Sequence, residues 1–316
     1  MTLSYLKRVL VTGAAGFVGS HLVRHLLNRP EPPESIIALD LRPGKSDPRV
    51  CWVKADLADT PQVHRTLVDY EPSAVAHLAA APPRTDLKTC FEVNVRACSN
   101  LLAAVAARPR PPRMLIVGSA AQYGIDPGGC EVVDESHPLN VTTPYGLSKT
   151  LQESWAMLYA RDGGVPVIAV RPFNILGPGQ PSGLVPAAFL HQVAEVAAGR
   201  AAEVRVGNTS TLRDFTDVRD VAAAMALLLA ADEKVDGEVF NIASGEAVGI
   251  REMLVECIRL AGRDIPVRED LARLRPGDVP SITGDAGKLR KATGWQPRIP
   301  WRRSLADMWD ALSPAV

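Results

Sequence analysis

The chain has 316 residues, of which 47% are hydrophobic and 22% charged, a composition typical of packed globular proteins and not of disordered ones. Thirty-five basic and 35 acidic residues give a formal net charge of zero. This balance argues against nucleic acid or an anionic membrane as a partner, because both require a basic surface. The longest apolar stretch, 221–231, is about half of a membrane span, and the first eight residues lead directly into a strand-like segment. We therefore expect a soluble cytoplasmic protein.

The cysteines and histidines show no spacing typical of disulfide frameworks or metal sites. The five cysteines include no C-x-x-C pair and are odd in number, which is typical of reduced thiols. His21 and His25 lie four residues apart on a predicted helix, but packing is the simpler interpretation because no third ligand is near in sequence. We expect no metal site.

Short aliphatic runs alternate with longer helical patterns in the first half of the chain. The predicted strands are 9–11, 36–40, 74–78, 114–117 and 167–170. The predicted helices between them are 18–27, 62–70, 91–107 and 145–161. Because parallel strands need crossover connections, this alternation predicts an α/β fold with a Rossmann-like doubly wound parallel sheet.

The second half is less regular and includes a Pro/Gly-rich stretch at 177–183. The predicted elements here are helices 186–198, 221–231, 250–260, 289–293 and 301–312, with one strand at 239–242. We predict a dinucleotide-binding domain over 1–172, with 219–243 returning to it, and a smaller C-terminal α/β substrate-binding lobe over 173–218 and 244–316. The site is expected in the cleft between them, beyond the carboxyl ends of the strands.

Three glycines, Gly13, Gly16 and Gly19, follow the first predicted strand and open the first predicted helix. A tight turn without Cβ atoms lets amides at a helix N-terminus approach a pyrophosphate, and Gly19 lets the helix pack closely on the strand. The spacing is G-x-x-G-x-x-G, which alone is a weak motif. Asp40 strengthens it, because an acid about 20 residues on accepts hydrogen bonds from both ribose hydroxyls. Asp40 repels a 2′-phosphate and favours NAD, while Arg42 leaves NADP as the alternative.

Tyr145 and Lys149 are four residues apart and share one face of a predicted helix. An ammonium beside a phenol favours the phenolate, so Lys149 is expected to lower the pKa of Tyr145 and let it exchange a proton with a substrate oxygen near neutral pH. Lys149 can also hold the cofactor ribose. Ser119 follows the strand 114–117 and is placed to hydrogen-bond the same oxygen. A lone Tyr-x-x-x-Lys motif usually lies on a solvated helix face. The catalytic interpretation is supported here by the position of the motif after the strand 114–117.

Taken together, these residues resemble the extended short-chain dehydrogenase/reductases that act on nucleotide sugars, the NAD-dependent epimerase/dehydratase family. The resemblance covers nearly the whole chain. The matching residues and segments are Gly13, Gly16, Gly19, Asp40, 56–57, 77–80, Asn94, 118–119, 123–124, Tyr145, Lys149, 171–174, 177–180, 213–218 and 275–278. Within the family, segments 171–180, 213–220 and 275–280 look most like the GDP-4-keto-6-deoxymannose reductases.

The resemblance implies roles for individual residues. It makes Ser119, Tyr145 and Lys149 catalytic. It adds further contacts to NAD or NADP at Phe17, Val18, Asp56, Leu57, Ala79, Ala80 and Asn94. It places a nucleotide-diphosphate sugar against Ser119, Asn174, Arg213 and Arg275. Two guanidinium forks suit a diphosphate, although surface pairing with Asp214 and Asp278 is the alternative from spacing alone. Helices 91–107 and 145–161 are expected to pair across a homodimer.

The chain also departs from the family pattern. Ala120 and Ala121 stand where dehydratases carry Asp-Glu, and alanines supply neither an acid nor a base, so dehydration is not expected. Acidic residues often precede Tyr-Gly in the reductase branch, whereas Ala121-Gln122 precede Tyr123 here.

The predicted function is an NAD(P)-dependent reductase of a nucleotide-activated 4-keto-sugar similar to GDP-4-keto-6-deoxymannose, with hydride transfer to C4 and Tyr145 as the acid. The alternative is a nucleotide-sugar 4-epimerase with tightly bound NAD, because it would use the same three residues. A third reading is a non-catalytic dinucleotide-sensing module, which the presence of Ser119, Tyr145 and Lys149 disfavours.

Overall fold

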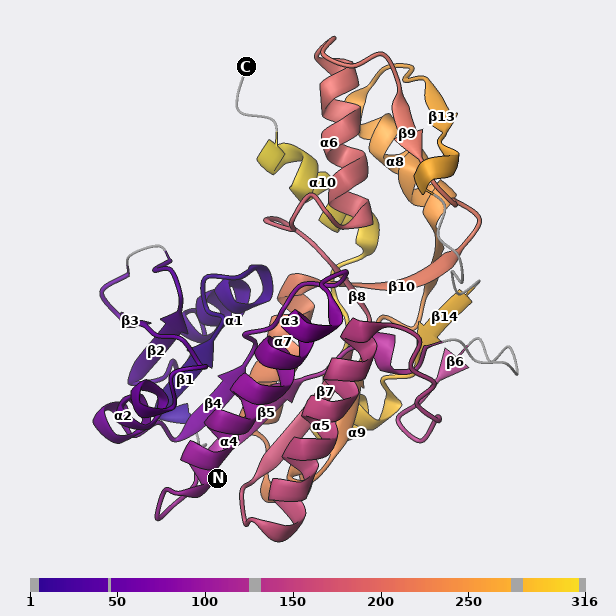
Figure 1. Cartoon of the computed structure of the whole chain (residues 1–316). Helices are drawn as coiled ribbons and strands as arrows, with labels where there is room; N and C mark the ends of the chain where they lie inside the picture. Colours follow the sequence, from indigo (N-terminus) through magenta and orange to yellow (C-terminus); the bar gives the residue numbers. More distant parts are fainter. Residues whose placement is uncertain (1–5, 45–46, 125–131, 274–280, 313–316) are drawn as a thin grey trace.

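A seven-stranded parallel sheet forms the centre of the molecule in the computed structural model, which describes residues 6–44, 47–124, 132–273 and 281–312 (Figure 1). Its strands are β1 (Arg8–Thr12), β2 (Ser35–Asp40), β3 (Val50–Lys54), β4 (Ala74–His77), β5 (Arg113–Val117), β7 (Val167–Pro172) and β11 (Val239–Ile242). They lie in the order β11-β7-β5-β4-β1-β2-β3, so the chain reverses direction across the sheet between β1 and β4. This order is that of a doubly wound Rossmann sheet, and the predicted fold class is confirmed.

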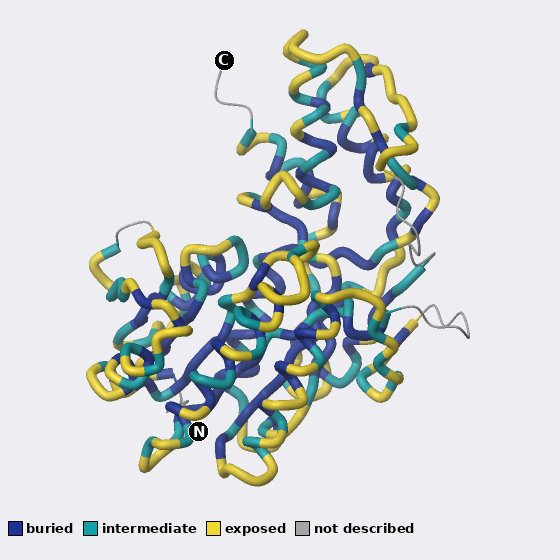
Figure 2. The backbone as a smooth tube through the Cα atoms, in the orientation of Figure 1, coloured by how far each residue is buried: buried dark blue, intermediate teal, exposed yellow. Residues whose placement is uncertain are grey.

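Helices cover both faces of this sheet, because its strands are apolar on both sides. One face carries α1 (Phe17–Leu27) and α7 (Val218–Ala230), and the other carries α2 (Thr60–Tyr70), α4 (Ala97–Ala106) and α5 (Pro144–Asp162). Along β1, Val9 and Val11 enter the core under α1 and α7, whereas Leu10 enters the opposite core. Figure 2 shows the resulting buried layer. The alternation follows from the two-residue period of a strand.

The predicted helix 91–107 is a composite of three segments. They are α3 (Leu87–Cys90), a π-helical turn η2 (Phe91–Arg96) and α4. Asp86 caps α3 by accepting a hydrogen bond from the backbone N–H of Thr89 at 3.0 Å. The π turn places the fully buried Asn94 against α5, and such turns occur often at functional sites.

A second, smaller lobe lies beyond the carboxyl ends of the central strands (Figure 1). A five-stranded sheet leads to it, made of β6 (Val132–Val133), β8 (Asn174–Leu176), β10 (Leu212–Asp217), β12 (Ala247–Gly249) and β14 (Ser281–Gly284). The lobe itself contains β9 (Val204–Val206), β13 (Val267–Glu269), α6 (Val185–Ala197), α8 (Ile250–Ala261) and α10 (Trp301–Leu312). The three helices share a hydrophobic core of their own. Short helices η3 (Ala120–Gln122), η4 (Glu233–Val235), η5 (Leu271–Arg273) and α9 (Gly287–Thr293) complete the elements.

The structure contains eight strands that the sequence did not predict: β3, β6, β8, β9, β10, β12, β13 and β14. β3 was not predicted, because this edge strand is only half-buried and ends in an exposed lysine. β10 was not predicted either, because arginine and aspartate side chains interrupt its apolar pattern. α9 and Trp295, which the sequence placed in the C-terminal lobe, pack instead in the core beneath β11 and α7. The boundaries between the two parts remain a proposal.

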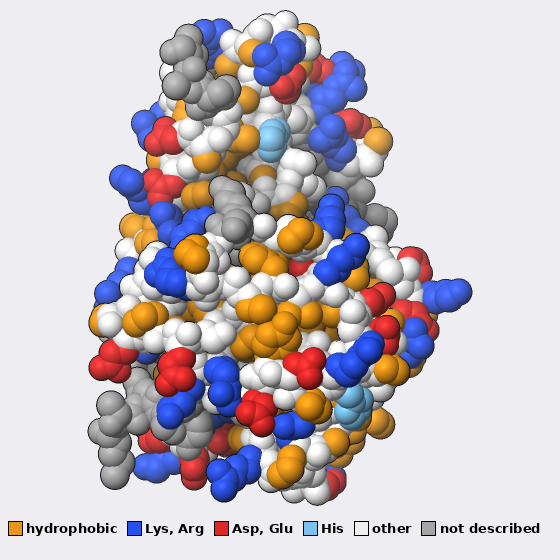
Figure 3. Space-filling view, turned by 90° about the vertical axis from the view of Figure 1, so that its left-hand side faces the viewer, with side chains coloured by type: hydrophobic (Ala, Val, Ile, Leu, Met, Phe, Trp, Pro, Cys, Tyr) orange, Lys and Arg blue, Asp and Glu red, His pale blue; other side chains and the backbone are white. Residues whose placement is uncertain are grey.

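The surface carries both signs of charge, as the balanced composition of the sequence predicts. Figure 3 shows acidic and basic side chains interspersed over the face in view. Over the described residues, no helix combines the length and the apolarity needed to cross a membrane.

Candidate active site

The glycine turn between β1 and α1 is built for close backbone approach. Gly13 has a φ of +67°, and a Cβ atom on it would lie 2.7 Å from the backbone nitrogen of Ala79. A Cβ atom on Gly19 would lie 2.1 Å from the carbonyl oxygen of Gly13. Gly16 precedes α1 without a side-chain cap, so no capping side chain takes up the first N–H groups of the helix, which can instead bind an anion. This turn fits the pyrophosphate of a dinucleotide.

Asp40 lies directly beside this turn. Its Oδ2 accepts a hydrogen bond from the backbone N–H of Ala15 at 3.0 Å, and its Oδ1 accepts one from Arg42 at 3.2 Å. The carboxylate is partly exposed at the end of β2 and retains lone pairs for further donors. The chain therefore has both parts of a dinucleotide site, an anion-binding turn and an acid for the ribose.

The other predicted cofactor residues also gather at this edge of the sheet. Phe17 and Val18 form the first turn of α1, Asp56 and Leu57 follow β3, and Ala79 and Ala80 follow β4. Leu57 is buried, whereas Asp56 is exposed. The backbone N–H of Ala79 donates to the hydroxyl of Thr12 at 3.2 Å, which ties the ends of β4 and β1 together.

Asn94 differs from these residues, because both ends of its side-chain amide have protein partners. Its Oδ1 accepts from the backbone N–H of Ala81, and its Nδ2 donates to the Ser148 hydroxyl, both at 2.8 Å. The residue braces the segment after β4 against α5. Its predicted cofactor contact stays a prediction.

Ser119, Tyr145 and Lys149 are brought together where β5 ends against α5. Ser119 caps η3, with its Oγ accepting from the backbone N–H of Ala121 at 3.2 Å. Its side chain also acts on the phenol of Tyr145 and lowers the pKa of that phenol. Lys149 lies with its Nζ 5.9 Å from the centre of the Tyr145 ring. It donates to the carbonyl oxygen of Val117 at 2.8 Å.

The pKa of Tyr145 moves opposite to the sequence-based expectation. Burial raises it to about 12, against the hydrogen bond from Ser119, which lowers it. Lys149 does not lower it, because its ammonium points to the Val117 carbonyl and to Oε1 of Gln152 at 2.9 Å. Burial lowers the pKa of Lys149 itself to about 8. At neutral pH Tyr145 therefore keeps its proton and is suited to donate it.

The predicted substrate residues lie on the strands that lead to the lobe. Asn174 and Arg213 are on the paired strands β8 and β10. Asn174 donates from Nδ2 to the carbonyl of Asp214 at 2.9 Å, and Arg213 donates to the carbonyl of Leu212 at 2.7 Å. Arg275, and Asp278 as its alternative partner, lie outside the described residues.

Acidic residues of the segment 213–220 are structural anchors. Asp214 is fully buried, and burial raises its pKa against four hydrogen bonds from Ser244, Gly245 and Gly284. Asp220 accepts from the backbone N–H groups of residues 298 and 299 at 2.8 and 2.9 Å. These contacts fix β10 and α7 against the segments that follow them.

His21 and His77 occupy buried packing positions. His77 is fully buried and bonds the hydroxyl of Thr12 at 2.8 Å, and burial lowers its pKa to about 3. His21 contacts the carbonyl oxygen of Pro178 at 2.9 Å. Among the described residues, no group of three or more His, Cys, Asp and Glu side chains is placed to hold a metal ion.

Sequence reasoning assigned no role to three buried residues behind Ser119. Gln122, Glu153 and Arg171 form one hydrogen-bonded chain there. The position of Glu153, four residues after Lys149 on the same helix face, was the available clue. Gln122 was noted only as a departure from the acidic pattern.

Fold and site together define an NAD(P)-dependent enzyme on a Rossmann sheet. The chain belongs to the NAD dependent epimerase/dehydratase family, whose model matches residues 9–243. A GDP-6-deoxy-D-mannose reductase of Pseudomonas aeruginosa is 31% identical over 313 residues, covering 95% of each chain.

Solved structures agree with this assignment. RMD from Pseudomonas aeruginosa, complexed with NADPH, matches with a TM-score of 0.83 and 29% identity over 96% of this chain and 98% of that one. A Thermus thermophilus UDP-glucose 4-epimerase complexed with NAD matches with a TM-score of 0.85 and 30% identity over 98% of this chain and 100% of the other. Reductases and epimerases are thus similarly close to this chain.

Proposed function

We propose that this protein is an NAD(P)H-dependent reductase of a nucleotide-activated 4-keto-sugar, similar to GDP-4-keto-6-deoxymannose. The similarity to the GDP-6-deoxy-D-mannose reductase over 95% of both chains supports this substrate class. The bound cofactor supplies hydride for C4 of the sugar.

The observation that carries the proposal is the placement of Ser119, Tyr145 and Lys149 together at the carboxyl end of β5. Reduction of a ketone creates negative charge on its oxygen, so the site needs a proton donor and a hydrogen-bond donor there. Tyr145 gives its proton to that oxygen, and Ser119 holds the oxygen in place. Lys149 holds the ribose of the cofactor.

Binding of cofactor and substrate uses separate parts of the chain. The turn of Gly13, Gly16 and Gly19 binds the pyrophosphate. Asp40 accepts hydrogen bonds from the ribose hydroxyls, and its negative charge favours NAD over NADP. Asn174, Arg213 and Arg275 bind the nucleotide diphosphate. Their strands lead from the central sheet to the lobe, which supports a substrate bridging the two.

The second candidate is a nucleotide-sugar 4-epimerase, favoured by the similarity to the Thermus thermophilus UDP-glucose 4-epimerase. It would use Ser119, Tyr145 and Lys149 twice, to oxidise C4 and then to reduce the opposite face. Its first step needs a proton acceptor and its second a proton donor, and Tyr145 would serve as both. A non-catalytic role is the weakest candidate, because all three residues are present.

The first experiment denatures the freshly purified protein and measures the released nicotinamide nucleotide, its phosphorylation and its redox state. For a reductase, we expect a site that takes up and releases added NADH or NADPH. Near-stoichiometric NAD that does not exchange would support the epimerase, because internal recycling needs a retained cofactor.

The second experiment measures turnover of GDP-4-keto-6-deoxy-D-mannose with NADH or NADPH, and conversion of UDP-galactose without added cofactor. Tyr145→Phe is expected to lower kcat roughly 100-fold or more, because general acid catalysis contributes about that much. Tyr159→Phe, at the far end of α5, is the matched control. Retained turnover in Tyr145→Phe would refute the catalytic assignment.

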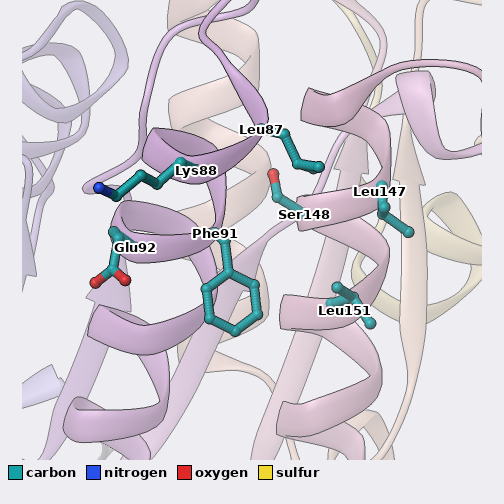
Figure 4. A pocket seen from close by; sticks show the side chains of 7 residues that line it. All are labelled: Leu87, Lys88, Phe91, Glu92, Leu147, Ser148 and Leu151. Atoms are coloured by element: carbon teal, nitrogen blue, oxygen red, sulfur yellow. The ribbon is translucent and has the colours of Figure 1, made fainter.

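We also propose a homodimer formed by the outer faces of α3, η2 and α5. The exposed apolar side chains on these faces are Leu87, Phe91, Leu147, Leu151, Trp155 and Leu158. Figure 4 shows four of them lining the groove between the two segments, with Lys88 and Glu92 beside it. A contiguous apolar face of this kind is typical of interfaces, and the same face on a second copy would cover it.

A further inference from the structure

A buried amide holds the backbone of Ser119 from behind. Gln122 is fully buried, and its Oε1 accepts a hydrogen bond from the backbone N–H of Ser119 at 2.8 Å. Its own backbone N–H donates to the Ser119 carbonyl at 3.0 Å, so the two residues form a capping box around η3. Gly118 gives the amide its room, because a Cβ there would lie 2.3 Å from Gln122 Oε1.

The other end of the same amide reaches a buried ion pair. Gln122 donates from Nε2 to Oε2 of Glu153 at 2.9 Å. Glu153 is held in turn by Arg171, which donates from Nε at 2.9 Å and from Nη2 at 2.5 Å. Both side chains of the pair are 5% exposed. Burial lowers the pKa of Arg171, but the hydrogen bond and charge of Glu153, together with Tyr123, outweigh the burial and raise the pKa.

Arg171 links the pair to the far side of the site. Its Nη1 donates to the phenol oxygen of Tyr123 at 3.1 Å, and that hydroxyl donates to Oδ1 of Asn241 at 2.7 Å. The pair is therefore fixed between α5, β7 and β11. A buried charge pair with its hydrogen bonds satisfied resists movement, because breaking it leaves an unpaired charge.

The side chain at position 122 must both accept and donate in this arrangement. It accepts from the backbone N–H of Ser119 and donates to the Glu153 carboxylate, and glutamine does both without taking up a proton. A glutamate would place a second carboxylate against Glu153, and two such groups about 3 Å apart cannot both ionise.

Glu153 lies on the same face of α5 as Tyr145 and Lys149, at successive four-residue intervals. We propose that Gln122 is a positioning residue that fixes Ser119 relative to Tyr145 by tying the end of β5 to this face of α5 through Glu153. The inference rests on the proposed function for its kinetic consequences. Loss of the tie displaces the Ser119 hydroxyl from the phenol without touching cofactor or sugar.

The experiment compares Gln122→Met, Gln122→Glu and the exchange Gln122→Glu/Glu153→Gln, with GDP-4-keto-6-deoxy-D-mannose and the preferred cofactor. The two single variants are expected to lose kcat roughly 10- to 100-fold, the effect of an approximately 1 Å misplacement, with KM within about twofold. The exchange is expected to stay slow, because an amide nitrogen in place of Oε2 of Glu153 could donate to position 122 but could not accept from Nε of Arg171. Gln192→Met is the control, since its Oε1 also accepts a backbone N–H, in the lobe.

A purely structural role predicts a different result. Single variants that lower the melting temperature but leave kcat unchanged, or an exchange that turns over as fast as the wild type, would overturn the proposal. If one single variant is too unstable to purify, the kcat of the other single variant decides.

Hydrogen exchange of the Ser119 amide separates this inference from the proposed function. If the wild type turns over neither nucleotide sugar, the proposed function fails, whereas the tie is still tested. We expect the Ser119 amide to lose protection in Gln122→Met and to keep it in the control Gln192→Met. Unchanged protection in Gln122→Met would overturn the tie.

Discussion

Lys149 donates from Nζ to the carbonyl oxygen of Val117 at 2.8 Å, and so ties the predicted catalytic helix to the last residue of β5. Only Gly118 separates this carbonyl from Ser119. The ammonium is 2% exposed, and its second acceptor is Gln152. Lys149 therefore orders the position of Ser119 as well as that of the helix.

The contribution of Lys149 to the stability of the protein is expected to rise with pH as this residue titrates. Burial lowers its pKa from 10.5 to about 8. Below pH 8 the lysine is charged in both the folded and the unfolded protein, so the folded protein bears the full free-energy cost of burying the charge. Between about pH 8 and 10.5 the unfolded chain binds more protons than the folded one, so the free energy of unfolding increases, by up to about 3 kcal/mol.

Urea denaturation of the wild type and of Lys149→Met at intervals from pH 7 to pH 10 tests this sign. The free energy of unfolding of the wild type, relative to that of Lys149→Met, should increase as pH rises. Lys88→Met, which removes an exposed lysine of α3, should show no such trend. Parallel pH profiles for wild type and Lys149→Met would contradict the expectation.

Alanine at Gly13 or Gly19 is expected to disrupt both the turn and cofactor binding. The φ of +67° at Gly13 alone costs about 1–2 kcal/mol for a residue with a Cβ atom, before the contact with Ala79. At Gly19 the new Cβ would meet the Gly13 carbonyl. Gly183→Ala, with nothing within 4 Å of the added atom, should stay within about 0.5 kcal/mol of the wild type.

Thermal unfolding and fluorescence titration with NADH measure the two effects separately. If the cofactor binds at this turn, a Gly13→Ala or Gly19→Ala variant that still folds should bind NADH more weakly as well as being less stable. A variant that is destabilised but binds NADH as tightly as the wild type would place the cofactor elsewhere.

The sequence predicted the central sheet because its strands are uninterrupted aliphatic runs between helical patterns. The missed strands β3 and β10 carry charged or half-exposed side chains, whose position is set by tertiary pairing and not by local pattern. The junction of Ser119, Tyr145 and Lys149 could be predicted, since all three lie at the carboxyl edge of the sheet. The direction of the Tyr145 pKa could not, because spacing says nothing about burial or about where an ammonium points.

The contact between Gln122 and Glu153 could not be predicted from the sequence either, because the sequence does not show which way the Gln122 side chain points. A glutamine before Tyr123 could face solvent or the sugar, and no periodicity separates these from burial against Glu153. Only the fold shows that η3 turns this side chain inward.

Replacing Asp40 by serine is expected to shift the cofactor preference from NADH toward NADPH. Hydrogen bonds to a charged acceptor are worth about 1.5–3 kcal/mol, so the affinity for NADH should fall roughly 10- to 100-fold. Removal of the carboxylate also ends its repulsion of a 2′-phosphate near Arg42. Equilibrium titrations with both cofactors test this, and Asp47→Ser, in the loop beyond, is the control. An unchanged NADH-to-NADPH affinity ratio would rule out Asp40 as the selecting residue.

Arginine at Leu151 is expected to convert the proposed dimer to a monomer. Leu151 is 41% exposed in the single chain, in the groove beside Phe91 and Leu147. A second copy would bury it near its own counterpart, so the variant would bring two like charges together in an apolar interface. Val255→Arg is the matched control, because Val255 is 60% exposed on α8 of the lobe.

Sedimentation equilibrium over a range of protein concentrations measures the association directly. We expect a dimer for the wild type and for Val255→Arg, and a concentration-dependent monomer for Leu151→Arg that keeps its fold by circular dichroism. A wild type that stays monomeric, or a Leu151→Arg variant as dimeric as the control, would show that another surface or partner covers this face. Retained turnover in monomeric Leu151→Arg would further show that each chain carries a complete site, because every residue assigned to catalysis comes from one copy.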